Sequence, residues 1–218
     1  LDIKTNVPNL NNVVSTVNGR AQVTYGNKNW NTSILGTNPA YATMHSAVAQ
    51  SGRFFTDDEN TARARLAVIG MTVVRELFGT ENPLGSMIKI NKVNFQVIGI
   101  LPTKGANGFR DQDDIIVVPL NAAMYRLLGK DYVDTIEIEV AGQQFTEQAQ
   151  ESILSRINTR RRIPVSQQED AYQDRNMAEI QEALSSSTKI MSLLLSAIAS
   201  ISLVVGGIGI MNIMYVSV

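Results

Sequence analysis

Apolar positions in the N-terminal two thirds of the chain recur in short runs that predict β-strands separated by turns. Residues 20–25 alternate between apolar and polar side chains, and residues 30–35 do so again after the turn residues 26–29. These segments predict a β-hairpin. Residues 87–90 and 93–101 predict a second hairpin, whose second strand is apolar on both faces near its end and is therefore expected to lie inside a sheet. Other predicted strands are 66–69, 115–118 and 135–140.

The strand at 135–140 alternates strictly, so its two faces can be assigned. Ile136, Ile138 and Val140 are expected to face a core, and Glu137 and Glu139 are expected to face water.

A period of 3.6 residues predicts amphipathic helices between and after the strands. One is expected over 72–78, capped by Thr72 and ended by Gly79 in the position just past a helix. A second is expected over 121–128. A third has apolar residues spaced by four from Phe145 to Ile157. It is expected to end at Arg160–Arg162, where positive charge suits the helix dipole, and before Pro164.

A longer helical pattern begins near Glu169. Neither Pro nor Gly interrupts residues 170–205, so one continuous helix is expected there. Residues 190–218 contain no Asp, Glu, Lys or Arg, and this run of 29 residues exceeds the roughly 20 that cross a bilayer. The pattern predicts a stalk helix at 169–189 that continues into a transmembrane helix at 190–218.

Small side chains gather on one face of the predicted membrane helix, which favours close helix packing in lipid. The alternative is that Ser and Gly are simply tolerated in a membrane helix. The six residues of this small-residue face are Ser192, Ser196, Ala199, Ser202, Gly206 and Gly209.

Composition excludes several classes of function. The 19 basic and 20 acidic residues nearly balance, so no basic excess is available to hold a nucleic-acid backbone. The absence of cysteine excludes disulfides, thiolate nucleophiles and cysteine metal sites, and the single histidine, His45, excludes histidine dyads and triads. The chain begins at Leu1 and stops inside an apolar run, which is the pattern expected of an excerpt from a larger membrane protein.

Other candidate chemistry is weak. The segment 79–85 has two glycines near phosphate-loop spacing but carries Ser86 where a lysine is needed. The acidic groups 57–59 and 111–114 could bind a hard cation, but they lack calcium-loop spacing, and solvated carboxylates are the simpler interpretation. His45 has no evident acid–base partner. Arg160–Arg162 could also contact lipid headgroups or an acidic partner. No catalytic, cofactor or metal site is predicted.

The segment Thr103–Asp114 is predicted to be an exposed loop, longer than a simple connection needs. Phe109 and Arg110 lie side by side in it, and these residue types often anchor interfaces. They are the predicted partner contact, with a mobile hairpin tip as the alternative.

Taken in order, a set of short motifs resembles one family: the periplasmic core domain and second transmembrane helix of MacB-type ABC transporter permeases, within the FtsX-like superfamily. The resemblance covers nearly the whole chain. It is carried by Gly52-Arg53-Phe54-Phe55, Ala67-Val68-Ile69-Gly70, Leu77-Phe78-Gly79, Asn82-Pro83-Leu84-Gly85, Phe95-Gln96-Val97-Ile98-Gly99-Ile100-Leu101, Val117-Val118-Pro119-Leu120 and the apolar residues 201–214.

The resemblance implies an α+β fold with a two-lobed extracytoplasmic domain. Residues 1–45 and 133–168 would form a split α/β lobe, and residues 46–132 an inserted mixed α/β lobe. The stalk helix would follow and continue into the transmembrane helix. The protein would lie in the bacterial inner membrane, with residues 1–189 on the periplasmic or extracellular side.

The resemblance also implies a function. Such permeases work as homodimers driven by an ABC ATPase domain or subunit, which uses ATP, while this chain needs no cofactor. An adaptor and an outer-membrane duct would complete an exporter of drugs, peptides, toxins or lipoproteins. The alternative is an FtsX-like signalling permease that activates a partner such as a cell-wall hydrolase. A membrane-anchored enzyme is the third hypothesis, and no set of nucleophile and base residues in the sequence supports it.

Overall fold

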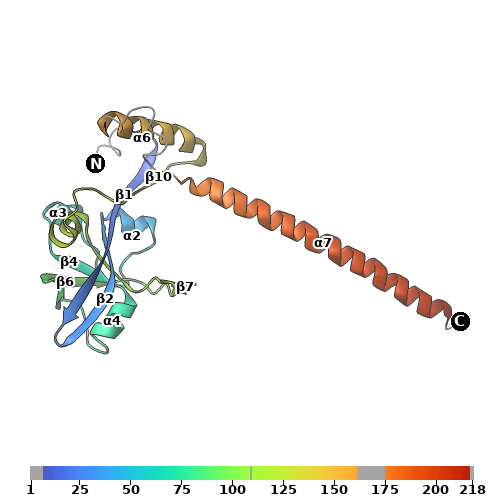
Figure 1. Cartoon of the computed structure of the whole chain (residues 1–218), viewed down its shortest axis with the longest axis horizontal. Helices are drawn as coiled ribbons and strands as arrows, with labels where there is room; N and C mark the ends of the chain where they lie inside the picture. The colour runs from blue at the N-terminus through green and yellow to red at the C-terminus, as the bar shows by residue number, and fades with distance from the viewer. Residues whose placement is uncertain (1–6, 109, 162–174, 217–218) are drawn as a thin grey trace. The chain divides into compact units, whose positions relative to one another are not determined.

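The computed structural model describes residues 7–108, 110–161 and 175–216. The chain divides into two compact units, Leu1–Leu154 and Ser155–Val218. The first unit, called the head below, holds a β-sheet with short helices, and the second is dominated by one long helix (Figure 1).

The predicted first hairpin is confirmed, and its first strand is longer than expected. Strands β1 (Leu10–Tyr25) and β2 (Lys28–Thr37) pair antiparallel from Thr16–Thr37 to Tyr25–Lys28. The remaining head strands are β3 (Ser51–Gly52), β4 (Leu66–Ile69), β5 (Met87–Ile90), β6 (Val93–Ile100), β7 (Ala106–Asn107), β8 (Arg110–Asp111), β9 (Ile115–Pro119) and β10 (Thr135–Val140). Every strand predicted from the sequence is therefore present.

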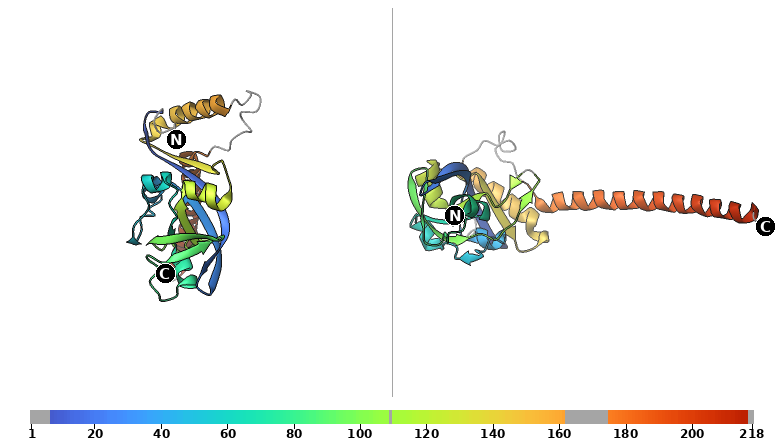
Figure 2. Two further views of the ribbon diagram at one scale, coloured as in Figure 1. Left: turned by 90° about the vertical axis from the view of Figure 1, so that its left-hand side faces the viewer. Right: turned by 90° about the horizontal axis from the view of Figure 1, so that it is seen from below.

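Six of the strands pair in a ring. Around it, β1 pairs with β2, β2 with β9, β9 with β4, β4 with β6, β6 with β5, and β5 again with β1. The β2–β9 and β4–β6 pairs are parallel and the others antiparallel, so the sheet is mixed. Strand β10 extends the sheet beyond β1 at one end (Figures 1 and 2). Strand β3 extends it beyond β6 at the other end.

Two apolar cores hold this sheet together. The larger core lies against helix α4 (Met71–Leu77) and includes the fully buried Phe95, Ile34 and Leu77. The smaller core contains Leu35 and Val117, neighbours of Ile34 and Ile116 on the same strands. Because successive strand residues face opposite sides, the two cores occupy opposite faces of the sheet.

The helices before Phe145 are short, and the last two, which follow it, are longer. They are α2 (Ala40–Met44), α3 (Asp57–Thr61), α4, α5 (Leu120–Ala122), the π-helix η1 (Ala123–Leu128), the 3₁₀ turn η2 (Gln143–Phe145), α6 (Thr146–Arg161) and α7 (Met177–Val216). The helix predicted over 121–128 is thus split into α5 and η1. The helix predicted from Phe145 is α6, and Arg162 and Pro164 lie outside the described residues.

Two predicted details are wrong, namely the cap of the helix at 72–78 and the faces of the strand at 135–140. Helix α4 is capped at Gly70, and the hydroxyl of Thr72 instead donates to Asp111 Oδ2 at 2.7 Å. On β10, Ile136 is 37% exposed, whereas Glu137 is half-buried beside His45. Strand β10 is the end strand of the sheet order, so strict alternation did not decide which side chains were covered.

The predicted lobes, 1–45 with 133–168 and 46–132, remain a prediction. One observation bears on them, because the larger core takes Val17 and Ile34 from the first lobe and Phe95 and Ile116 from the second. Strands of both predicted lobes therefore contribute to one core.

Candidate functional site

The predicted loop Thr103–Asp114 contains a small hairpin. Strand β7 pairs with β8 through Ala106–Asp111 and Asn107–Arg110. Of the two predicted contact residues, Arg110 lies on β8, and Phe109 lies outside the described residues. Their role in partner contact remains a prediction.

Three carboxylates hold the foot of this hairpin in place. Asp113 accepts the backbone N–H groups of Lys104 and Gly105 at 2.8 and 3.0 Å. Asp111 accepts the Thr72 hydroxyl at 2.7 Å and the Asp113 N–H at 2.9 Å, and the pKa of Asp111 is lowered, first by the Thr72 bond. Asp114 accepts the indole N–H of Trp30 at 2.8 Å.

These bonds give the acidic residues a structural role that neither sequence interpretation included. No cluster of metal-ligating side chains occurs within 7–108, 110–161 and 175–216. The acidic residues at 111–114 anchor the backbone and two side chains, rather than being simply solvated.

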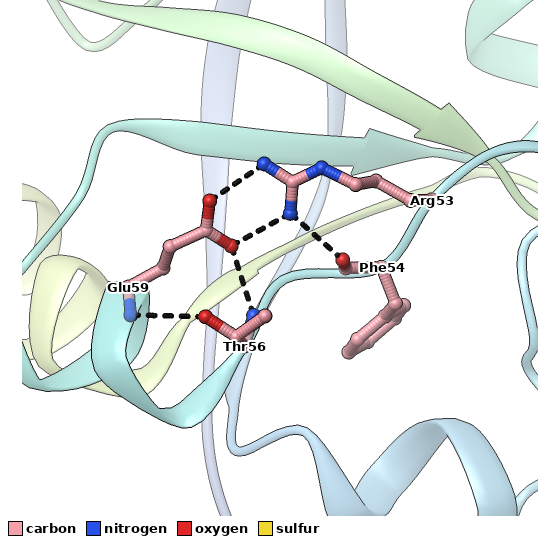
Figure 3. Close-up of polar contacts among 4 residues, drawn as sticks. All are labelled: Arg53, Phe54, Thr56 and Glu59. Atoms are coloured by element: carbon pink, nitrogen blue, oxygen red, sulfur yellow. Dashed lines mark hydrogen bonds and ion pairs between the residues drawn. The ribbon is translucent and has the colours of Figure 1, made fainter.

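The other acidic group forms the start of helix α3. Thr56 and Glu59 make a capping box, in which the Glu59 N–H donates to Thr56 Oγ1 at 3.3 Å and the Thr56 N–H donates to Glu59 Oε2 at 2.9 Å. The guanidinium of Arg53 donates to both oxygens of Glu59, at 2.6 and 2.8 Å (Figure 3). These bonds, led by those from Arg53, lower the pKa of Glu59 to about 2.

The arrangement explains one of the motifs behind the resemblance. Arg53 also donates to the backbone carbonyl of Phe54 at 3.2 Å, so one side chain fixes the turn that precedes α3 (Figure 3). Phe55 is buried in the smaller core. Within the Gly52-Arg53-Phe54-Phe55 motif, Arg53 and Phe55 thus have roles in the local structure.

His45 has a carboxylate partner that the sequence did not reveal. Its Nε2 lies 2.5 Å from Oε2 of Glu137 on β10, a residue 92 positions away. The ring of Tyr41 stacks on the imidazole at 4.3 Å. Burial, followed by the charge of Glu137, raises the pKa of the Tyr41 phenol. The contact ties α2 to β10, which is a structural role for this histidine.

Helix α7 has the properties of a membrane span. Within the stretch Glu179–Asn212, an 18-residue window reaches a mean hydropathy of 2.3, and the side chains of that window are exposed. Forty helical residues extend about 60 Å at roughly 1.5 Å per residue, more than a bilayer core requires. The helix passes Lys189 without a break, as predicted. The prediction of one continuous helix from near Glu169 is wrong, because Arg175 and Asn176 are not helical and α7 begins at Met177.

The small-residue face runs along this helix. The Ser202 hydroxyl donates to the Ile198 carbonyl at 2.9 Å, so its polar group is satisfied within the helix itself. Such a serine can lie in lipid or against another helix without an unpaired hydroxyl. Whether Ser192, Ser196, Ala199, Ser202, Gly206 and Gly209 pack against a second helix remains a prediction.

Known proteins match this chain over almost its whole length. A family model described as MacB-like periplasmic core domain matches residues 1–156. The macrolide export ATP-binding/permease protein MacB of Bdellovibrio bacteriovorus is 54% identical over 99% of this chain and 33% of that protein. The pyoverdine export ATP-binding/permease protein PvdT of Pseudomonas aeruginosa is 34% identical over 97% of this chain and 31% of that protein. The chain spans about a third of the length of these relatives.

Solved structures show the same fold at low sequence identity. The extracellular domain of the noncanonic ABC-type transporter YknZ from Gram-positive bacteria has a TM-score of 0.66 at 19% identity, over 75% of this chain and 83% of that one. The periplasmic region of MacB from Actinobacillus actinomycetemcomitans has a TM-score of 0.62 at 18% identity, over 72% and 71%. The predicted mixed α/β extracytoplasmic fold, followed by a long apolar helix, is confirmed. The chain belongs to the MacB-like periplasmic core domain family.

Proposed function

We propose that this chain is the extracytoplasmic and stalk portion of an ABC exporter permease. Its task is to transmit ATP-driven motion across the bacterial inner membrane, with residues 1–189 on the periplasmic side. The observation that carries the proposal is helix α7, which runs without interruption from Met177 through Lys189 into an apolar stretch long enough to span a bilayer.

The physical argument rests on stiffness. A continuous α-helix transmits displacement along its axis, whereas a Gly- or Ser-rich coil of the same length would absorb it. Residues 185–187 are three consecutive serines, yet they remain helical. The hydroxyl of Thr188 donates back to the Leu184 carbonyl at 3.0 Å, so this polar side chain is satisfied within the helix.

The relatives support the assignment to export. The names of MacB and PvdT combine an ATP-binding part with a permease, and they specify macrolide and pyoverdine export. In our proposal the ATPase is a domain or subunit outside this chain, the permease is a homodimer, and an adaptor and an outer-membrane duct complete the path. The cargo is a drug, peptide, toxin or lipoprotein. The chain itself performs no catalysis and needs no cofactor.

The test is a proline at Ser187 in the full-length transporter. Proline removes one backbone donor and clashes with the carbonyl one turn back, which costs about 3 kcal/mol or more inside a helix. We expect Ser187→Pro to abolish macrolide resistance in a susceptible host, while ATP binding to the purified transporter is retained. Ser187→Ala, which keeps the helix, should behave as wild type.

Unchanged resistance in the Ser187→Pro strain would contradict the rod-like role of the helix. The FtsX-like alternative gives a different result. In that case the wild-type transporter would export no supplied cargo, while its deletion would change cell-wall hydrolase activity.

A further inference from the structure

A pocket of about 410 Å³ opens on the head between β2, α2 and the foot of the β7–β8 hairpin. Ligand pockets commonly enclose roughly 300–1,000 Å³, so this one can hold a small organic molecule. Part of its wall is apolar and comes from Ala47, Leu101 and Ile115, all of which belong to or pack on the smaller core. No pattern in the sequence indicates this pocket, because its walls come from four separate segments, at positions 33, 41–47, 101–104 and 111–115.

Another part of the wall carries a net negative charge. Asp111, Asp113 and Asp114 line the pocket together with one cation, Lys104, which gives the four ionisable side chains a formal charge of −2. The ammonium of Lys104 is already directed to the carbonyl of His45, at 2.8 Å.

The hydrogen-bond partners of the three carboxylates do not cancel their charge. The donors described above are a hydroxyl, backbone N–H groups and an indole, all of which are neutral. Arg75 acts on Asp111 through its charge, but its own guanidinium bonds Glu76 at 3.2 Å. Within the described part of the chain, no cation therefore bonds these carboxylates directly, and each carboxylate oxygen has a second lone pair for a further donor.

We propose that this pocket binds a small organic cation, with a protonated amine at the carboxylates and an apolar body against Ala47, Leu101 and Ile115. Two half-buried polar side chains, Ser33 and Tyr41, also line it and can orient the ligand. As a class of cargo this inference rests on the proposed function, but binding itself requires neither ATP nor transport. A failed export assay and a failed binding assay are therefore distinguishable.

The chain carries its own reporter for the test. Trp30 is the only tryptophan, and its indole N–H bonds Asp114 Oδ1 on the pocket wall at 2.8 Å. We would titrate the full 218-residue chain in detergent micelles with 4-phenylbutylamine and follow Trp30 fluorescence, with calorimetry as a second readout. The matched probes are the neutral 4-phenylbutan-1-ol and the anionic 5-phenylpentanoate. The amine should bind at least about tenfold more tightly than the alcohol, because a bond between charged groups adds roughly that factor. The carboxylate should bind least.

Two variants separate the pocket from general surface charge. Asp114→Asn keeps the shape and an acceptor oxygen for Trp30, and it should weaken amine binding about tenfold while leaving alcohol binding unchanged. Asp131→Asn removes the same charge at an exposed site outside the pocket and should have no effect. Ser33→Leu fills the pocket without altering its charge, and it should weaken binding of both amine and alcohol.

The proposal is overturned by any of three results. Equal binding of the amine and the alcohol would show partition into the micelle rather than recognition of charge. Wild-type affinity in Asp114→Asn would remove the carboxylates from the site. Wild-type affinity in Ser33→Leu would place the ligand elsewhere.

Discussion

Gly36 occupies a position on β2 where the sheet approaches helix η1 too closely for any side chain. A Cβ atom there would lie 2.2 Å from the Cβ of Ala123 and 2.6 Å from Cγ1 of Val17. Ala123 and Val17 are both buried in the larger core, so neither can move away into solvent.

We therefore expect Gly36→Ala to lower the free energy of unfolding of the head by about 1–3 kcal/mol, the usual cost of overpacking a core. Denaturant titration followed by Trp30 fluorescence measures this change. Asn31→Ala, at an exposed position of the same strand, serves as control and should stay within about 0.5 kcal/mol of wild type. Equal midpoints for Gly36→Ala and wild type would show that β2 and η1 can separate freely.

The Arg53–Glu59 pair predicts a specific pH dependence. The pKa of Glu59 is about 2 in the folded chain, below its ordinary value of 4.5, chiefly because Arg53 bonds the charged form. A lowered folded pKa means that the stabilisation is present in full above the ordinary pKa. It is then lost as the pH falls from about 4.5 through about 2.

Glu59→Gln should therefore reduce stability at pH 6, and its difference from wild type should shrink toward pH 2. Arg53 is 54% exposed, so solvent screening limits the effect to about 1 kcal/mol or less. Urea titrations at several pH values measure it, with the exposed Glu151→Gln as the charge-matched control. A Glu59→Gln deficit that stayed constant down to pH 2 would mean that the charge is not its cause.

Local contacts at single residues could be predicted from sequence, and distant ones could not. Gly79 was correctly predicted to follow α4, because a residue at φ +65° just past a helix end is a local requirement that glycine meets best. The His45–Glu137 contact joins residues 92 positions apart, and no spacing rule indicates it. Thr72 looked like a cap because its true partner, Asp111, lies 39 residues further along the chain.

At the scale of elements, helix α7 carries the most direct prediction. Gly206 lies on the small-residue face, where a close helix partner would meet it, and Val204 lies about 160° away around the helix at roughly 100° per residue. Gly206→Leu should weaken self-association in detergent micelles at least tenfold, because a bulky side chain prevents close backbone approach. Val204→Leu should associate as wild type does. Energy transfer between labelled copies measures both. Undiminished association of Gly206→Leu would remove the small-residue face from the interface.

Elements defined by their own periodicity were predicted well. Strands β4 and β10 have the predicted bounds, and the β5–β6 hairpin turns at Asn91 and Lys92, both with positive φ, as a tight two-residue hairpin requires. The β7–β8 hairpin was missed because each strand has only two residues, too few for any alternation to be visible. The π-helix η1 was predicted as an ordinary helix, because six residues are too few to distinguish its wider turn from that of an α-helix.

At the scale of the whole molecule, the mixed α/β class and the long apolar helix followed from the sequence, and the order of strands did not. Strand order depends on which distant segments pair, and the pairing of β1 with β5 closes a ring that no local pattern encodes. The pocket was missed for the same reason, because its walls also come from segments that are distant in the sequence. The lobe boundaries likewise depend on contacts between distant segments, and they remain a prediction.

The pairing of β1 with β10 also sets a minimum time for completing the sheet during biosynthesis. Asn12 of β1 bonds Glu139 of β10, 127 residues later in the chain. Ribosomes add roughly 5–20 residues per second, so the first half of β1 waits about 6–25 s for its edge partner. Helix formation takes microseconds or less once the residues are made, so this pairing is limited by synthesis of the intervening chain. A nascent chain paused before residue 135 would therefore expose the N-terminal half of β1 to pairing with other chains.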